Sequence, residues 1–379
     1  MSQRTEKSRA LRGVRRVVVK VGSNVLAGDG GLRLGRVRGL AADVATLLGA
    51  GRQVVLVSSG AVAAGAGQLG PRRRGVEWRQ AAAAVGQPAL MAAYARAFAK
   101  HGRGVAQVLV THGDLADRRR YLNARHTLRA LLDLGVVPIV NENDTVAVEE
   151  LNFGDNDNLS ALTATLVQAD LLVILSDVAG LFTADPRMDR TATRIAIARV
   201  GDAALARMAG PSRSAVGTGG MASKLSAART AAAAGIATVI ADGSRPHTLA
   251  RVFDPDADVG TLLVADGDPL AHRKHWIAHT LRPQGTLQLD AGAERAVLQG
   301  KRSLLPSGVR SVEGRFGVGD CVRLLGADGV EIGRGLVSYA SAELAKIAGA
   351  QTKDIAERLG YKGSDEVVHR DDLVVTAKR

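Results

Sequence analysis

A cluster of acidic and amide side chains between residues 141 and 158 could bind a cation or a ligand rich in hydrogen-bond donors. Its two parts are 141–144 and 154–158, and the second opens into an apolar helical pattern. From residue 130 to residue 186 the chain has ten acidic residues and no Lys or Arg, although its net charge is +13. Such a local concentration of charge is typical of a binding site. A solvated, capped turn is the alternative interpretation.

Two lysines occur where an ammonium group could meet an anion. Lys20 interrupts an apolar strand predicted at 17–21, and a buried ammonium group is costly unless it is paired. Lys224 lies about one turn inside a helix predicted at 222–234, after the glycine-rich segment 217–220. Backbone N–H groups, the helix dipole and an ammonium group together favour a phosphate ligand. The sequence therefore predicts a phosphate site, whereas a flexible glycine loop is the alternative.

Other phosphate-binding patterns are less convincing. Gly65-x-Gly67-x-x-Gly70 matches the dinucleotide pattern, but it begins well after the preceding strand and lacks the acidic residue expected about 20 positions later. We interpret these glycines as positions of close helix packing. The chain has no Gly-x-x-x-x-Gly-Lys-Ser/Thr motif, which argues against a P-loop NTPase.

Apolar strands alternate with helices through the first part of the chain. The predicted strands are 17–21, 54–57, 105–110, 136–140, 171–175 and 236–241, and the predicted helices end near 51 or span 81–100, 122–134 and 222–234. Continuous Val, Ile and Leu runs are typical of parallel strands covered on both faces. The predicted fold is therefore α/β, with an open, mostly parallel sheet covered by helices on both faces. Ligands of such sheets bind beyond the carboxyl ends of strands, where the polar candidates lie.

From residue 285 the pattern changes to short alternating strands, with Asp328 and Gly329 as a hairpin turn. We therefore expect a small β-rich domain after the α/β domain. The expected boundaries are a catalytic domain at 1–268, a linker at 269–284 and the β-rich domain at 285–379.

Composition excludes several classes of protein. The single cysteine, Cys321, cannot form an internal disulfide or a metal site of several thiolates, and it indicates a reducing compartment. The longest uncharged run, 53–71, contains serine and glycine and fits a buried strand, a turn and a helix better than a membrane span. The basic N-terminal segment lacks the apolar run of a secretory signal. We expect a cytoplasmic protein without a membrane partner.

The positive charge is concentrated in the first domain, because residues 283–379 carry 14 basic and 13 acidic side chains. The arginine runs at 72–74 and 118–120 lack interleaved aromatic residues, so we interpret them as solvated surface and expect no nucleic-acid partner. An RNA-binding protein acting through the β-rich domain is an alternative from a different class. A nearly neutral domain offers few of the phosphate contacts that dominate RNA affinity.

The chain resembles the amino acid kinase family, and within it the enzymes that act on the γ-carboxylate of glutamate. The matching segments are 18–23, 57–61, 121–125, 141–144, 154–161, 181–187 and 217–224. Residues 304–308 and 369–372 resemble a PUA domain, a partner specific to that branch. The chain departs from the usual pattern at Ser58 and Ser176, where Thr is frequent, and at Phe182, where Tyr is frequent.

The resemblance implies ATP-dependent phosphorylation of L-glutamate to γ-glutamyl phosphate, the first step of proline biosynthesis. It implies Mg²⁺ as cofactor, proline as feedback inhibitor and a homo-oligomer. It places Lys20, Asp157 and Lys224 in the catalytic centre and assigns no metal ligands. It assigns glutamate binding to Ser59, Asp144 and Asn156, and ATP binding to Lys20, Ser176, Asp177, Thr218, Gly219, Gly220, Met221, Ala222, Ser223 and Lys224.

Elementary chemistry agrees with these implied roles. A carboxylate with a pKa of about 4.3 is ionised at pH 7, so phosphorylation needs no general base and must instead overcome repulsion between two anions. Asp144 is expected to pair with the substrate ammonium group. A kinase for another carboxylate, such as N-acetylglutamate, is the alternative enzyme, and there Asp144 would lack a charged partner.

Overall fold

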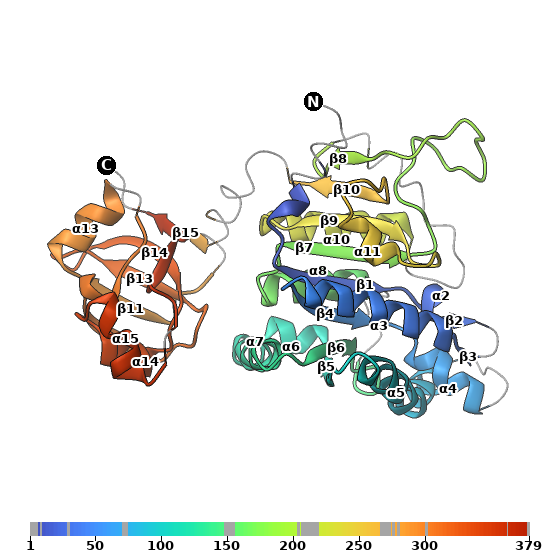
Figure 1. Ribbon diagram of the computed structural model, residues 1–379, viewed down its shortest axis with the longest axis horizontal. Coiled ribbons are helices and arrows are strands. Elements are labelled where there is room, and N and C mark those ends of the chain that lie inside the picture. Colours follow the sequence, from blue (N-terminus) through green and yellow to red (C-terminus); the bar gives the residue numbers. More distant parts are fainter. Residues whose placement is uncertain are drawn as a thin grey trace. The chain divides into compact units, whose positions relative to one another are not determined.

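The computed structural model divides into two compact units, Met1–Asp266 and Gly267–Arg379 (Figure 1). The described residues are 7, 10–28, 31–69, 75–147, 156–202, 205, 220–265, 274, 277–278, 281–299, 302–361 and 363–376. None of the described helices is both long enough and apolar enough to cross a bilayer.

An eight-stranded sheet forms the centre of the first unit, in the order β5-β6-β4-β1-β7-β9-β10-β8. Neighbouring strands are parallel except for the antiparallel pair β9 and β10, so the prediction of an open, mostly parallel sheet is confirmed. The strands are β1 (Arg16–Val21), β4 (Gln53–Ser58), β5 (Val105–Val110), β6 (Val137–Glu142), β7 (Leu171–Ser176), β8 (Ile197–Arg199), β9 (Ala237–Asp242) and β10 (Thr261–Val264). The short strands β8 and β10 were not predicted.

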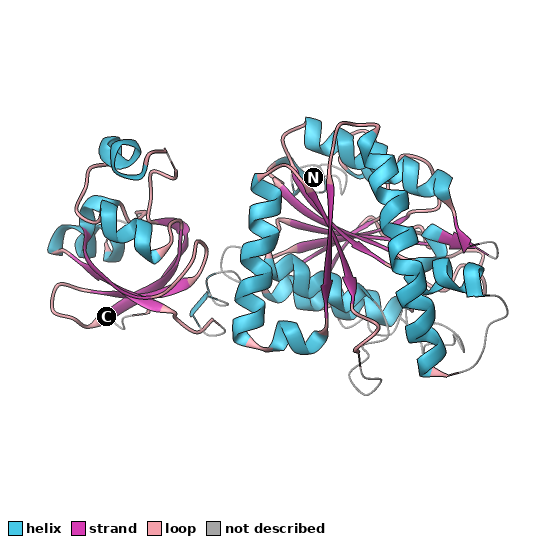
Figure 2. Cartoon of the chain, turned by 90° about the horizontal axis from the view of Figure 1, so that it is seen from below, coloured by secondary structure: helices cyan, strands magenta, loops and turns pink. Residues whose placement is uncertain are grey.

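Helices cover both faces of this sheet (Figure 2). On one face α3 (Leu34–Gly49), α5 (Val76–Ala99) and α11 (Thr248–Val252) share an apolar core with Val17, Val19 and Val21 of β1. Because successive side chains of a strand point to opposite faces, Lys20 points to the other face. The helices α8 (Asn156–Leu166) and α10 (Met221–Ala233) pack together there. The remaining elements are α2 (Ser23–Leu26), β2 (Ala27–Gly28), β3 (Gly31–Leu32), α4 (Ala61–Leu69), α6 (His112–Ala116) and α7 (Arg118–Asp133).

The second unit contains a five-stranded sheet in the order β12-β11-β13-β14-β15. The predicted hairpin turn is confirmed, because β13 and β14 pair antiparallel and Gly329 has a φ of +83°. The helices and β15 were not predicted, because their apolar patterns are short. The elements are β11 (Gly285–Leu289), α13 (Ala291–Leu298), η2 (Pro306–Gly308), β12 (Val309–Gly314), β13 (Cys321–Leu325), β14 (Glu331–Val337), α14 (Ser341–Ile347), η3 (Thr352–Asp354), α15 (Ile355–Leu359) and β15 (Val368–Val375).

The segment expected to be a linker contributes side chains to the second unit. Ile277 and Leu281 are buried in an apolar cluster with Cys321 and Leu336. Cys321 therefore packs as a small apolar residue. The compact unit begins at Gly267, before the first strand of its sheet.

Two glycines allow α4 and α5 to cross at close range. A Cβ atom placed on Gly65 would lie 1.8 Å from the carbonyl oxygen of Ala82, and one on Gly86 would lie 1.9 Å from that of Ala61. Both neighbouring atoms belong to backbone and cannot move aside by a rotamer change. The interpretation of Gly65 as a position of close helix packing is confirmed.

We predict that Gly65→Ala destabilises the first unit, because the helices must separate to admit the methyl group. Overpacking of this kind costs about 1 to 3 kcal/mol, and each 1 kcal/mol lowers the melting temperature by roughly 2 to 4 °C in a domain of this size. Thermal melts followed by circular dichroism measure the change. Gly49→Ala is the matched control, because a Cβ there meets nothing within 4 Å. Equal melting temperatures for the two variants would contradict the packing argument.

Candidate active site

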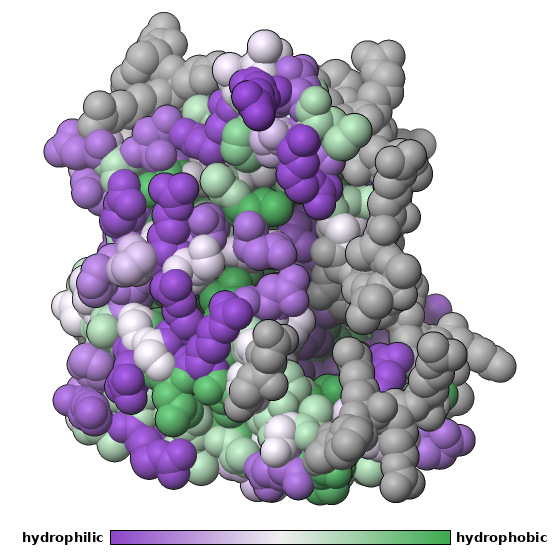
Figure 3. Space-filling view, turned by 90° about the vertical axis from the view of Figure 1, so that its right-hand side faces the viewer, coloured by the Kyte–Doolittle hydropathy of each residue, from purple (hydrophilic) through white to green (hydrophobic). Residues whose placement is uncertain are grey.

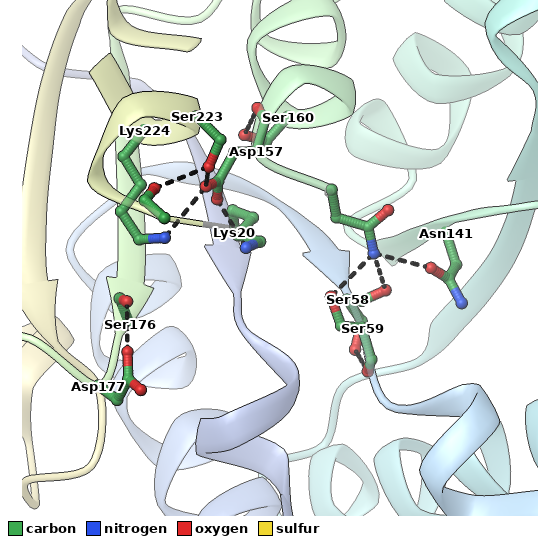
Figure 4. Close-up of polar contacts among 12 residues, drawn as sticks. Lys20, Ser58, Ser59, Asn141, Asp157, Ser160, Ser176, Asp177, Ser223 and Lys224 are labelled. Carbon is green, nitrogen blue, oxygen red and sulfur yellow. Dashed lines mark hydrogen bonds and ion pairs between the residues drawn. The ribbon is translucent and has the colours of Figure 1, made fainter. Parts of the chain in front are cut away.

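A fully buried carboxylate lies between two ammonium groups on the α8 and α10 side of the sheet (Figure 4). Oδ1 of Asp157 is 2.6 Å from Nζ of Lys20, and Oδ2 is 3.2 Å from Nζ of Lys224. The hydroxyl of Ser223 donates to the same Oδ2 at 2.8 Å. The three residues of the predicted catalytic centre are thus brought together by two ion pairs.

Each member of this cluster is positioned by a different element. The alternation of β1 turns Lys20 away from the core that contains Val19 and Val21. Asp157 is the second residue of α8, and Lys224 lies in the first turn of α10. Because α8 and α10 pack together, the carboxylate reaches both lysines. Lys20, which lies inside an apolar strand, is therefore paired, because a buried ammonium group is costly without a partner.

The ammonium groups of this cluster are poorly solvated. The side chains of Lys20 and Lys224, which both contact Asp157, are at most 6% exposed. In a poorly solvated site such charges interact strongly with an anion because little water screens them. The geometry can therefore attract and orient a phosphate group or stabilise charge that develops on one.

The amide of Asn156 joins the start of α8 to the ends of β4 and β6, where its partners Ser58, Ser59 and Asn141 lie (Figure 4). Its Nδ2 lies 3.0 Å from the carbonyl oxygen of Ser58, 2.9 Å from the hydroxyl of Ser59 and 3.0 Å from Oδ1 of Asn141, so its two hydrogens are shared among three acceptors. The structure therefore brings the predicted residues Ser59 and Asn156 into direct contact. An amide and a hydroxyl at the ends of β4 and α8 can hold a small polar substrate.

Sequence reasoning missed the support behind this contact. The amide of Asn141 donates to Oε1 of Gln87 at 3.0 Å, and Gln87 donates in turn to Gln107 at 3.3 Å. The hydroxyls of Ser58 and Tyr94 are 2.8 Å apart. A glutamine inside the apolar stretch of α5 was the available signal, since a buried amide needs partners.

Asp144 lies just beyond β6, close to the same edge of the sheet. It makes no hydrogen bond or ion pair with any residue that the structure describes. Burial raises its pKa, and the positive charge of Arg79 opposes that rise. Burial also raises the pKa of Glu142, and the negative charge of Asp144 adds to the effect. A half-buried carboxylate without a partner in the described chain suits a cationic ligand.

Ser176 and Asp177 lie together at the carboxyl end of β7 (Figure 4). The hydroxyl of Ser176 donates to Oδ1 of Asp177 at 3.0 Å, and Asn24 donates to Oδ2 at 2.9 Å. Burial alone would raise the pKa of Asp177, but these hydrogen bonds and the charge of Lys224 hold that pKa below its usual value. Asp177 is therefore an ionised carboxylate fixed in direction.

The predicted glycine-rich phosphate segment is only partly described. Gly220 precedes α10, and its carbonyl oxygen lies 2.9 Å from the hydroxyl of Ser223. Met221 and Ala222 open the helix, whereas Thr218 and Gly219 lie outside the described residues.

Figure 3 views the first unit from the side of α2, where hydrophilic side chains surround small apolar patches.

Within the described ranges no three His, Cys, Asp or Glu side chains form a group that could hold a metal ion. Mg²⁺ commonly uses one or two carboxylates together with substrate phosphates and water. The described side chains form no protein cage for a magnesium ion, so an ion bound there would be held mainly by the nucleotide.

Comparison with known proteins assigns the chain to a family. The model of the amino acid kinase family matches residues 15–242, and the PUA domain model matches residues 285–359. A glutamate 5-kinase from Geobacter sp. (strain M21) is 52% identical over 368 residues, which cover 96% of this chain and 98% of the relative. A glutamate 5-kinase from Myxococcus xanthus (strain DK1622) is 53% identical over 370 residues, 97% of each chain.

Among solved structures, the carbamate kinase from Giardia lamblia bound to AMP-PNP has a TM-score of 0.49 at 16% identity and covers 67% of this chain and 99% of its own. The family model spans more than half of the chain, and the relatives span nearly all of it. The chain therefore belongs to the amino acid kinase family and carries a C-terminal PUA domain.

Proposed function

We propose that this protein transfers the γ-phosphoryl group of ATP to the γ-carboxylate of L-glutamate, giving γ-glutamyl phosphate and ADP. This is the first step of proline biosynthesis. The observation that carries the proposal is the buried cluster of Lys20, Asp157 and Lys224 in a chain that is about half identical to glutamate 5-kinases. Two buried ammonium groups held side by side suit a reaction between two anions.

The proposed reaction needs alignment and charge compensation. A γ-carboxylate oxygen attacks the γ-phosphorus, the bond from that phosphorus to the bridging oxygen breaks, and its electron pair leaves with ADP. No proton moves, because the carboxylate is already ionised at neutral pH. The ammonium groups of Lys20 and Lys224 compensate charge on the transferred group, and Asp157 fixes their positions. Mg²⁺, bound with the nucleotide, would neutralise further phosphate charge.

The nucleotide is proposed to contact Lys20, the pair Ser176 and Asp177, and residues 218–224. Support comes from the fixed direction of Asp177 and from the placement of Lys224 in the first turn of α10. Backbone N–H groups at the start of such a helix favour phosphate. The described members of this set belong to three segments that meet at the carboxyl edge of β1 and β7.

Glutamate is proposed to bind between Asp144 and the contact of Asn156 with Ser59. The carboxylate of Asp144 would pair with the substrate ammonium group, and the hydroxyl of Ser59, whose oxygen accepts from the Asn156 amide, would donate to a substrate carboxylate. The supporting observation is that Asp144 has no partner in the described chain while it remains half-buried. A kinase for an acylated amino acid would gain nothing from this charge.

Further proposals concern the setting of the enzyme. We propose a cytoplasmic homo-oligomer inhibited by proline, with a catalytic domain at 1–268, a linker at 269–284 and a PUA-like domain at 285–379. All residues of the proposed site precede Gly267, so the first compact unit would contain the chemistry.

Trapping of the acyl phosphate with hydroxylamine tests the proposed reaction. We expect ATP-dependent hydroxamate with L-glutamate, and little with L-aspartate or N-acetyl-L-glutamate, because the first is shorter and the second lacks the ammonium charge. Hydroxamate is measured as its ferric complex, with ADP release in parallel. Preferential reaction with N-acetyl-L-glutamate would overturn the proposed substrate.

We predict that Asp144→Asn raises the KM for glutamate by about tenfold or more, because a hydrogen bond between charged groups is worth roughly 1.5 to 3 kcal/mol. The KM for ATP should change little. Burial raises the pKa of Asp144, so in the wild type the KM for glutamate should rise as the pH falls through that raised value and Asp144 becomes neutral.

Initial rates over a pH series measure this behaviour, and the Asn variant should lose that part of the pH dependence. Glu142→Gln is the matched control, since burial raises the pKa of this neighbouring carboxylate as well. Equal effects of the two substitutions on the KM for glutamate would remove Asp144 from its proposed role.

A further inference from the structure

A cavity of about 430 Å³ lies on the α3 and α11 face of the sheet. Val21 and Leu175, at the ends of β1 and β7, contribute to its apolar lining. Lys20 and Val21 are successive residues of one strand and therefore point to opposite faces. The cavity is thus separated by the sheet from the cluster around Asp157.

Two glycines of α3 leave this cavity open. Gly35 and Gly39 are four residues apart, so they lie on one side of the helix, and both line the cavity. A Cβ on Gly39 would meet nothing within 4 Å, and one on Gly35 would meet only an Arg38 nitrogen at 4.0 Å. Glycine inside a helix is less favourable than alanine. Packing therefore does not require glycine at either position. The absence of side chains there leaves space in the cavity.

Apart from Arg36, each charged residue of the cavity lining has a side-chain hydrogen bond or ion pair within the described residues. Asp43, its acidic lining residue, is within 3.0 Å of Nδ1 of His247 and accepts from the backbone N–H of Leu249 at 3.2 Å. Arg245 pairs with Asp242 at 3.2 Å, outside the lining. Arg33 donates to the carbonyl oxygen of Asn24 at 3.3 Å.

Arg36 also lines the cavity and is half-buried, and its guanidinium group makes no hydrogen bond or ion pair with the described residues. A guanidinium group offers two parallel N–H donors to a phosphate or carboxylate. The cavity therefore combines an unpaired guanidinium group with an apolar lining. These are the two features that bind an anion with an apolar part. A volume of 430 Å³ is within the usual range for small-molecule sites.

We infer that this cavity binds an organic anion, a phosphate or carboxylate attached to a flat or apolar body. Arg36 binds the anionic group, and the body occupies the space beside Gly39, against Val21 and Leu175. The inference does not depend on the proposed kinase reaction, because the two sites lie on opposite faces of the sheet.

Calorimetric titration of the full-length protein tests the inference with three matched probes: phenyl phosphate, inorganic phosphate and phenol. Phenyl phosphate carries both the body and the anion, and each of the others carries one part. We expect saturable binding of phenyl phosphate, with inorganic phosphate and phenol each at least about tenfold weaker, because apolar burial and a charged hydrogen bond each contribute roughly 1.4 kcal/mol or more.

Two variants separate the parts of the site. Arg36→Met keeps the apolar stem and removes the charge, and Gly39→Leu fills the space. Each should weaken phenyl phosphate at least about tenfold. The controls are Arg38→Met and Gly49→Leu, since neither residue lines the cavity and a Cβ on Gly49 meets nothing within 4 Å. Melting temperatures show that all four variants fold.

Binding of phenyl phosphate to the proposed nucleotide site would not change with substitutions in α3. A titration that is the same in the wild type, Arg36→Met and Gly39→Leu would therefore overturn the inference, as would the absence of saturable binding in the wild type. A weakened titration in both cavity variants but in neither control would support it.

Discussion

The arrangement of the proposed active site depends on the charge balance of Asp157. Its carboxylate is fully buried between the ammonium groups of Lys20 and Lys224. Leaving a buried charge without its partner costs about 3 to 5 kcal/mol, so without this carboxylate the two ammonium groups would repel each other in a poorly solvated space. One side chain thereby fixes β1, α8 and α10 relative to one another at the carboxyl edge of the sheet.

The relative positions of the lysine pair and of the Asn156 amide follow from this constraint. α8 carries Asn156 immediately before Asp157, so the element that balances the lysines also delivers the amide that contacts Ser59. Behind that amide, Asn141 and Gln87 form a buried line of hydrogen bonds. Satisfied buried amides of this kind favour one arrangement over others, because an unpaired amide would be costly there. The two lysines and the Asn156 amide are therefore held at a fixed separation.

Some parts of this arrangement could be predicted from the sequence, and others could not. The continuous apolar strands indicated the parallel sheet, and Lys20 inside one of them required an anionic partner. The identity of that partner came from the family resemblance, because no local pattern links Lys20 with Asp157. The hydrogen bond of Gln87 and the cavity beside Gly39 depend on how helices pack, which periodicity does not specify. The short helices of the second unit gave too few turns for a clear apolar pattern.

The most direct test of the central claim is the kcat of Lys224→Met, measured beside its melting temperature. This substitution leaves Asp157 paired with Lys20, so the buried charges still balance and the melting temperature should stay close to that of the wild type. Loss of one group that stabilises transition-state charge typically lowers kcat by about 100- to 1000-fold. We predict a loss of that size with the fold intact. A kcat within about threefold of the wild type, smaller than any loss expected from such a group, would contradict the account and make Lys224 a structural residue.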